Sequence, residues 1–247
     1  MRVAVIGARG RMGRAVCQTV SAAPDLELAA QIDITDDSDD LDALAGCDVA
    51  VLFSVPDVAL EHALACIRAG VHAVIGTTGW TPERLATVRT ALESAAGVGV
   101  LVAPNFALGA VLLLRFAQLA APHYESVEVV ELHHPDKVDA PSGTARHTAE
   151  LIAAARAKAG SPAMPDATTT SLDGARGADV DGVRVHSVRL RGLVAHEEVL
   201  FGGPGEILTL RHDSLDRSSF MPGVLLGVRT VGTRPGLTVG LEHYLPA

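Results

Sequence analysis

The sequence of 247 residues has few of the residues that mark secreted or metal-binding proteins. Its three cysteines, Cys17, Cys47 and Cys66, are odd in number and contain no CxxC pair. This pattern argues against a secreted disulfide scaffold and against a cysteine zinc site. Aromatic residues make up only 3% of the chain, so the core must be built mostly from Ala, Val, Leu and Ile.

The chain also lacks long apolar runs and clusters of positive charge. No apolar run approaches the length of a membrane span. The apolar start, Met1–Ile6, leads directly into a glycine turn, which is typical of a buried strand rather than a signal peptide. The formal net charge is -9 and the basic residues are scattered, so nucleic acid is not an expected partner. We therefore expect a cytosolic, globular protein that binds neither nucleic acid nor membranes.

Up to Asn105, short apolar runs alternate with helical patterns. This alternation is typical of βαβ units and a parallel sheet, and strands that are apolar throughout are buried on both faces. Strands are expected at residues 2–6, 26–32, 49–55, 71–75 and 98–103. Helices are expected at 12–20, at 58–69 and after Thr81-Pro82, where a capping residue precedes a first-turn proline. The acidic segment 35–40 is expected to be a loop.

After Asn105 the pattern changes to long helices and alternating strands. Helices are expected at 107–121, 144–159 and 219–231, and strands at 127–132, 183–191, 195–201, 206–211 and 237–241. A loop at 133–142 and a long surface excursion at 160–182 connect them. The sequence thus predicts an α/β protein, in which a parallel-sheet domain is joined to an α+β domain with a mainly antiparallel sheet.

A glycine-rich segment joins the first expected strand to the first helix. It reads Gly7-Ala8-Arg9-Gly10-Arg11-Met12-Gly13, with a GxxGxxG spacing. Glycine permits a tight turn and close backbone approach, and the helix N-terminus offers amide groups to a pyrophosphate. Asp33 lies twenty residues beyond Gly13, where a carboxylate can hold the adenosine ribose hydroxyls. The combination predicts a Rossmann-type dinucleotide site rather than an ordinary glycine turn.

The same loop leaves the choice of nicotinamide cofactor open. Asp33 would repel a 2′-phosphate and so favours NADH, whereas Arg9 and Arg11 could neutralise that phosphate and admit NADPH. Both arginines could equally be solvated. We expect the protein to use both NADH and NADPH.

Further loops follow the expected strands at their carboxyl ends, the edge where open parallel sheets bind ligands. These loops contain Phe53, the turn Gly76-Thr77-Thr78-Gly79 and the turn Ala103-Pro104-Asn105-Phe106. Each could be an ordinary turn, but three at one edge predict the nicotinamide half of the site.

Groups suited to acid–base chemistry follow the strand expected at 127–132. His133, His134 and Lys137 fall within five residues. Histidine can act as a general acid near neutral pH, and lysine can bind a carboxylate or pass a proton. A metal site at the two histidines is not expected, because adjacent strand residues point to opposite faces.

An anion site is expected a few residues later. Ser142 fits a helix N-cap, so the amides of Gly143 and Thr144 would point outward toward an anion. A substrate with two carboxylates would suit these groups. One carboxylate would bind the amides, and nearby cations would hold the rest of the substrate.

These segments resemble the 4-hydroxy-tetrahydrodipicolinate reductase (dihydrodipicolinate reductase) family of bacterial lysine and diaminopimelate biosynthesis, in an actinobacterial-like form. The family signature E-x-H-H-x-x-K-x-D-x-P-S-G-T-A is matched from Glu131 to Ala145 without a gap. The loop at Gly7 and the turns at 76–79 and 103–106 also match, and the resemblance covers essentially the whole chain. Arginines stand at positions 9 and 11, where those relatives often carry lysine, which leaves the cofactor preference open.

The resemblance implies NAD(P)H-dependent reduction of a cyclic dicarboxylate to tetrahydrodipicolinate with loss of water. It implies that His133 and Lys137 are the acid–base pair, with Lys137 as proton donor. The residues implied to bind substrate are His134, Ser142, Gly143 and Thr144. It further implies a dinucleotide-binding domain at 1–106 and 217–247, a substrate-binding domain at 107–216, and a homotetramer formed through the sheet of the second domain.

Two other functions fit the sequence less well. A semialdehyde dehydrogenase needs a cysteine nucleophile near the nicotinamide, but the three cysteines lie in helices of the first domain or near a strand start, where burial explains them more simply. A non-catalytic nucleotide sensor would not need His133 and Lys137, and replacing both should leave its function intact.

Overall fold

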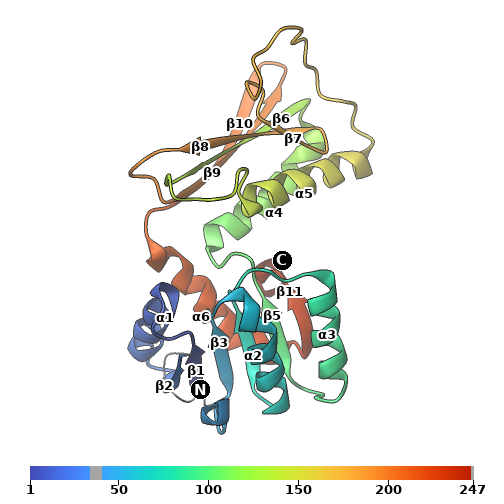
Figure 1. Cartoon of the computed structure of the whole chain (residues 1–247). Coiled ribbons are helices and arrows are strands. Elements are labelled where there is room, and N and C mark those ends of the chain that lie inside the picture. Colours follow the sequence, from blue (N-terminus) through green and yellow to red (C-terminus); the bar gives the residue numbers. More distant parts are fainter. Residues whose placement is uncertain (34–40, 246–247) are drawn as a thin grey trace. The chain divides into compact units, whose positions relative to one another are not determined.

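The structure is a computed structural model that describes residues 1–33 and 41–245, so the segment 35–40, expected to be a loop, lies outside the described residues. The chain divides into two compact units (Figure 1). Unit 1 comprises Met1–Leu108 and Arg217–Ala247, and unit 2 comprises Gly109–Asp216. Over the described ranges, no helix combines the length and the apolar character needed to cross a membrane.

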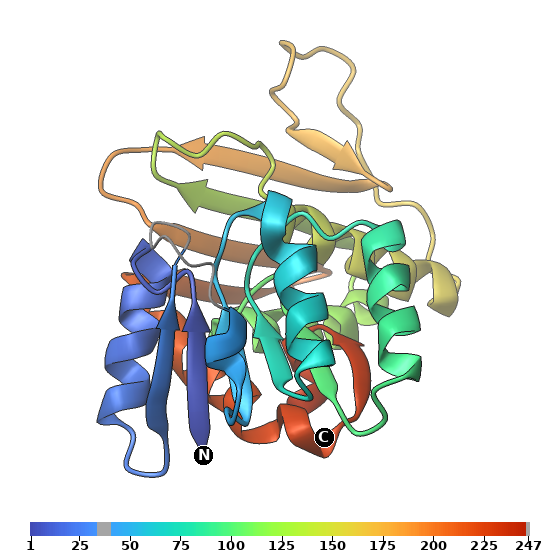
Figure 2. The ribbon, with the colours of Figure 1, turned by 60° about the horizontal axis from the view of Figure 1, so that its bottom comes forward.

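Unit 1 contains a six-stranded parallel sheet with the strand order β11-β5-β4-β3-β1-β2. Helix α1 packs against α6, and α2 packs against α3 on the opposite face (Figure 2). The strands are β1 Arg2–Ile6, β2 Glu27–Ile32, β3 Val49–Leu52, β4 His72–Ile75, β5 Gly99–Val102 and β11 Gly236–Val239. The helices are α1 Arg11–Ala22, α2 Pro56–Arg68, α3 Pro82–Glu93 and α6 Met221–Thr230. The predicted parallel sheet is confirmed.

Local sequence sets several boundaries in unit 1. Strand β3 ends at Leu52 rather than at Val55, and helix α2 begins at Pro56, which has no amide proton and fits the first turn of a helix. Val55 is extended, as a residue before proline should be. Thr81 caps α3 by accepting a hydrogen bond from the Arg84 amide at 3.4 Å, which confirms the predicted cap.

Unit 2 contains a five-stranded sheet with the strand order β10-β9-β6-β8-β7. The strands are β6 Ser126–His133, β7 Ala178–Val180, β8 Val183–Arg189, β9 Ala195–Gly203 and β10 Glu206–Ser214. The helices are α4 Leu108–Ala120 and α5 Gly143–Ala159. Neighbouring strands are antiparallel except for the parallel pair β6 and β8, so the mainly antiparallel sheet is confirmed with this one exception.

Two details of unit 2 differ from the expectation. The segment 160–182 is not a loop throughout, because Ala178–Val180 forms β7 and pairs with β8 across the turn Asp181-Gly182. Both turn residues have positive φ, which is the conformation that an Asp-Gly hairpin turn requires. The loop predicted to begin at His133 begins one residue later, because His133 is the last residue of β6.

The core of unit 2 lies between the sheet and its two helices. Alternate strand residues point to one face of a sheet, and here one set of them forms a single buried cluster with both helices. The cluster contains Leu113, Ala117 and Ala121 at α4, Ala145, Ala149 and Ile152 of α5, and Val127, Val129, Val183, Val185, Val199 and Phe201 of the strands. Both helices therefore cover the same face of the sheet.

Two carboxyl groups, those of Glu131 and Glu197, are buried at this helix-covered face. Glu197 is 7% exposed, and its Oε1 lies 2.5 Å from the hydroxyl of Thr148. The same hydroxyl also lies 3.0 Å from the carbonyl of Thr144, and it has one proton to donate. A protonated Glu197 satisfies both contacts, since it donates to Thr148 while Thr148 donates to Thr144. Burial, aided by the charge of Glu131, raises the pKa of Glu197 to about 7, although a hydrogen bond donated by Thr148 to the ionised carboxylate would lower it.

We expect Glu197→Gln to raise the free energy of unfolding, relative to the parent, more at pH 8 than at pH 5. Between pH 4.5, the ordinary pKa, and about 7, folded Glu197 keeps a proton that the unfolded chain has lost, so the free energy of unfolding falls as pH rises. Above this range the free energy of unfolding of the parent has fallen by about 3 kcal/mol. Urea denaturation at both pH values measures the difference between variant and parent.

The neighbouring Glu198, which is half-buried and paired with Arg211, provides the control variant Glu198→Gln. It should show no such gain at pH 8. An equal effect of Glu197→Gln at pH 5 and pH 8 would contradict a proton held on Glu197.

Candidate functional site

In unit 1, the glycine-rich loop connects β1 to α1 with very close backbone packing. Gly7 has a φ of +81°, which favours glycine. A Cβ atom at Gly13 would lie 2.0 Å from the Gly7 carbonyl oxygen, so the first turn of α1 can approach the loop only without a side chain there. Gly10 is the N-cap, no side chain caps the helix, and its first turn has no acidic residue. These features fit the phosphates of a dinucleotide.

Asp33 lies directly after β2, and its carboxylate contacts the same loop. The Arg9 amide donates a hydrogen bond to Asp33 Oδ2 at 2.8 Å. Both belong to a cavity of about 320 Å³, lined by Ile6, Gly7, Arg9, Gly10, Ile32, Asp33, Phe53, Ser54, Val55 and His62. The structure thus brings the predicted ribose-binding acid to the predicted phosphate loop. Arg9 and Arg11 are exposed, Ala8 is buried and Met12 is half-buried.

The loops after β3, β4 and β5 meet at one edge of the sheet. The rings of Phe53 and Phe106 are tilted against each other with centroids 5.8 Å apart. A Cβ atom at Gly76 would lie 2.1 Å from the Phe53 ring, so glycine is needed for this contact. The buried Thr77 hydroxyl donates toward the Ser54 carbonyl at 3.3 Å.

Other residues predicted for the nicotinamide half lie in the same loops. The Ala103 amide donates to the Ile75 carbonyl at 3.0 Å, which ties the loop after β5 to the end of β4. The side chain of Asn105 accepts a hydrogen bond from the Ala107 amide at 2.9 Å, which shapes the start of α4. Thr78 and Pro104 are exposed at the same edge.

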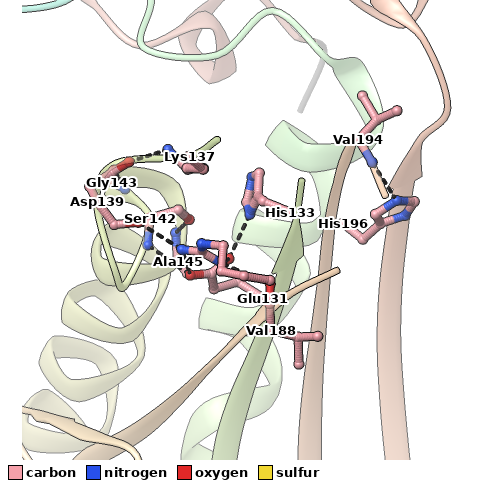
Figure 3. Close-up of polar contacts among 11 residues, drawn as sticks. Glu131, His133, Lys137, Asp139, Ser142, Gly143, Ala145, Val188, Val194 and His196 are labelled. Atoms are coloured by element: carbon pink, nitrogen blue, oxygen red, sulfur yellow. Dashed lines mark hydrogen bonds and ion pairs between the residues drawn. The ribbon is translucent and has the colours of Figure 1, made fainter. Parts of the chain in front are cut away.

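In unit 2, Glu131 lies at the centre of the contacts around His133 (Figure 3). The two residues are on the same face of β6, two positions apart. Glu131 Oε2 lies 2.5 Å from His133 Nδ1. Arg189, on the parallel neighbour β8, donates to both carboxylate oxygens, at 2.8 Å and 2.7 Å. The amide of Ser142 donates to Oε1 at 3.1 Å.

These contacts determine the charge of the cluster. Glu131 has no exposed surface, and burial alone would raise its pKa, but hydrogen bonds from Arg189, Ser187 and His133 lower it below its usual range. The pKa of His133 is lowered mainly by burial, although the Glu131 carboxylate opposes this effect. The cluster therefore holds a buried carboxylate against a guanidinium and a neutral imidazole near neutral pH.

An anion site is predicted at the start of α5, where the structure shows the following contacts. Ser142 is the N-cap, and its hydroxyl accepts a hydrogen bond from the Ala145 amide at 3.2 Å, which confirms the predicted cap. The Gly143 amide donates to Asp139 Oδ2 at 3.2 Å. The other oxygen of Asp139 forms an ion pair with the ammonium group of Lys137. The hydrogen bond from Lys137 lowers the pKa of Asp139.

The structure therefore brings together His133 and Ser142 through Glu131, and Lys137 and Gly143 through Asp139. His134 is exposed beyond the end of β6, and only its backbone carbonyl has a described contact, with the Lys137 amide at 3.2 Å. Thr144 is half-buried in the first turn of α5.

Sequence reasoning assigned no role to Glu131, Asp139 or Arg189. The alternation of β6 could have placed Glu131 beside His133, since the two are separated by one residue. Arg189 lies 58 residues from Glu131 and pairs with it only because β8 is parallel to β6, which no local pattern reveals. In the described residues, no three His, Cys, Asp or Glu side chains are grouped as metal ligands would be.

Two family models match the chain. The model described as dihydrodipicolinate reductase, N-terminus, matches residues 1–106, and the model described as dihydrodipicolinate reductase, C-terminus, matches residues 109–245. Together they cover nearly all of the sequence.

Curated relatives and a solved structure agree with these models. Proteins named 4-hydroxy-tetrahydrodipicolinate reductase from Streptomyces coelicolor and Nocardia farcinica are 62% and 61% identical, over 99% of this chain and 98% of each relative. A dipicolinate-bound dihydrodipicolinate reductase from Paenisporosarcina sp. TG-14 is 41% identical, with a TM-score of 0.88 and coverage of 99% of both chains. A probable dehydrogenase from Thermotoga maritima, 12% identical with a TM-score of 0.66, shares the fold alone. On these findings, the chain belongs to the dihydrodipicolinate reductase family.

Proposed function

We propose that this protein reduces 4-hydroxy-tetrahydrodipicolinate to tetrahydrodipicolinate, with loss of water, in lysine and diaminopimelate biosynthesis. The observation that carries the proposal is the uninterrupted signature Glu131–Ala145, whose charged groups gather at the end of β6 and the start of α5 in a chain of this family. The substrate is a small cyclic dicarboxylate.

The residues of unit 1 fit a nicotinamide dinucleotide. Gly7, Gly10 and the amides at the start of α1 would hold the pyrophosphate, and Asp33 would accept hydrogen bonds from the adenosine ribose. The loops with Phe53, Gly76, Thr77 and Phe106 would hold the nicotinamide half. NADH or NADPH, when bound, supplies the hydride that reduces the substrate ring.

The groups of unit 2 would bind substrate and supply the proton. Lys137 and the Gly143 amide already hold a carboxylate, that of Asp139, so the same two donors are placed to hold a substrate carboxylate in its stead. His134, Ser142 and Thr144 would add further contacts. Hydride transfer with loss of water consumes one proton, which we assign to Lys137, with His133 as its acid–base partner.

The protein is also proposed to be a cytoplasmic homotetramer that binds neither nucleic acid nor membranes. Support for assembly comes from the sheet of unit 2, whose helix-free face carries apolar side chains outside the buried cluster. Val130, Leu132, Val188 and Leu200 are only half-buried there.

We expect Lys137→Ala to lower kcat at least about 100-fold, the lower range for a group that transfers a proton. Binding of NADH, followed by fluorescence titration, should change little, because Lys137 lies in unit 2 and the nucleotide loops lie in unit 1. Turnover is measured by NADH oxidation with freshly generated substrate.

Lys158 is the other lysine of the chain and lies exposed in the last turn of α5, so Lys158→Ala is the matched control. It should retain full activity. Normal turnover in Lys137→Ala would exclude Lys137 as proton donor.

We expect Asp33→Ala to lower the ratio of kcat/KM with NADH to kcat/KM with NADPH by about tenfold, because a hydrogen bond to a charged group contributes about 1.5–3 kcal/mol. The carboxylate favours the ribose hydroxyls and repels a 2′-phosphate. The test compares kcat/KM for the two cofactors in each variant, with exposed Glu93→Ala in α3 as the control. An unchanged ratio would argue that Asp33 does not contact the ribose.

A further inference from the structure

The hydrogen bonds of Glu131 determine where the proton of His133 lies. The carboxylate lies within hydrogen-bonding distance of two nitrogens of Arg189, the Ser142 amide and His133 Nδ1, and the Ser187 side chain also donates to it. Guanidinium and amide groups only donate, so both carboxylate oxygens act as acceptors. An ionised Glu131 therefore requires a proton on His133 Nδ1. In the neutral ring, Nε2 is then the nitrogen that can accept a proton.

We infer that Glu131 is a positioning residue for the reduction, which fixes the imidazole of His133 with Nδ1 protonated and leaves Nε2 to exchange a proton with the reactants. The inference rests on the proposed function for the identity of those reactants. Arg189 belongs to the same arrangement, because its two donors hold the carboxylate ionised where no solvent reaches it. A carboxylate behind a histidine sets tautomer and orientation in the same way in other enzymes.

Glu131 also links the acid–base group to the anion site. Its Oε2 contacts His133 at the end of β6, whereas its Oε1 holds the amide of Ser142, the N-cap of α5. Arg189 adds a second link, because its Nη2 also donates to the Asp139 carbonyl at 2.7 Å. The two ends of the loop between β6 and α5 are therefore fixed to one side chain. A change at Glu131 should affect both the proton transfer and substrate binding, but not the cofactor.

The variant Glu131→Gln separates these effects, because the amide group has the same shape but only one acceptor oxygen. With its NH₂ group at the Oε1 position, the glutamine would face two donors, from Ser142 and Arg189. At the Oε2 position it would face one donor of Arg189 and could donate to His133 Nδ1. In the second orientation only one donor faces the NH₂ group, so we expect this orientation to prevail. Its NH₂ group then donates to Nδ1, which moves the imidazole proton to Nε2.

Four measurements follow from this change. Nitrogen-15 NMR of labelled histidine should show the Nδ1–H tautomer for His133 in the parent and the Nε2–H tautomer in Glu131→Gln, with the signal assigned by its loss in His133→Gln. The value of kcat should fall by about 100-fold, as expected for loss of a general acid–base group. The His133 limb of the pH–kcat profile should move to lower pH, because removal of a neighbouring negative charge lowers the pKa of the imidazole. The KM for NADH should not change.

Asp213 provides a matched control in the same unit. Its carboxylate lies 2.6 Å from His196 Nδ1 and is paired with Arg211, so it repeats the combination of acid, histidine and arginine away from the signature. Asp213→Asn should alter the NMR signal of His196 and leave kcat, KM and the pH profile unchanged.

Glu131→Asp covers the case in which the glutamine variant does not fold, as judged by circular dichroism. It keeps the charge, so the Nδ1–H tautomer should persist while the shorter side chain lowers kcat less than Glu131→Gln does. The inference is overturned if His133 keeps its proton on Nδ1 in Glu131→Gln, or if kcat and its pH profile match the parent. If the parent itself does not reduce the substrate, the proposed function fails, while the NMR result still decides whether Glu131 sets the tautomer.

Discussion

The arrangement of unit 2 depends on the buried ion pair between Glu131 and Arg189. Removing a carboxylate from water costs several kcal/mol, so a buried charge persists only where donors surround it. Here two donors from Arg189, the Ser142 amide, the Ser187 side chain and His133 surround it. The same charge affects the neighbouring strand, because Glu197 lies opposite Glu131 in the register of β6 and β9. Burial first, and then this nearby charge, keep the proton on Glu197.

The two units provide binding groups of different kinds. Unit 1 uses the backbone, with glycines at positions 7 and 13 that let the loop and helix approach each other and leave amides at the start of α1. Such a site suits a phosphate, which is recognised through many amide groups. Unit 2 uses side-chain charge, with Lys137 and the start of α5 beside an imidazole of fixed tautomer. Such a site suits a carboxylate and a proton transfer. The division agrees with a reductase whose cofactor is a dinucleotide and whose substrate is a small acid.

Much of the fold could be predicted from local signals. The parallel sheet follows from apolar strands separated by helical patterns, and the caps Thr81 and Ser142 have the residue type that helix starts prefer. Strand β7 could also have been found, because Asp181-Gly182 is a hairpin signal within the segment 160–182. The parallel pairing of β6 with β8 could not, since it depends on which strands meet in three dimensions.

In the site, too, residues close in the sequence could be predicted, whereas contacts between distant segments could not. The types and spacing of His133, Lys137 and Ser142 are visible in the sequence, because they lie in one short segment. The partners that determine their charge and orientation are not all visible. Arg189 reaches Glu131 from a strand 58 residues away, and the ion pair of Lys137 with Asp139 depends on the path of the loop. Sequence reasoning could therefore single out His133 and Lys137 as candidate acid–base groups, but it could not reveal the contacts that Glu131, Arg189 and Asp139 make with this segment.

The most direct test is a crystal structure of the protein with an unreactive cyclic dicarboxylate bound. We expect one carboxylate of the ligand within hydrogen-bonding distance of the Gly143 and Thr144 amides and of Lys137 Nζ, with Glu131 still bound to Arg189, His133 and Ser142. A ligand bound away from the start of α5, or a Glu131 carboxylate separated from Arg189 in the complex, would contradict the account.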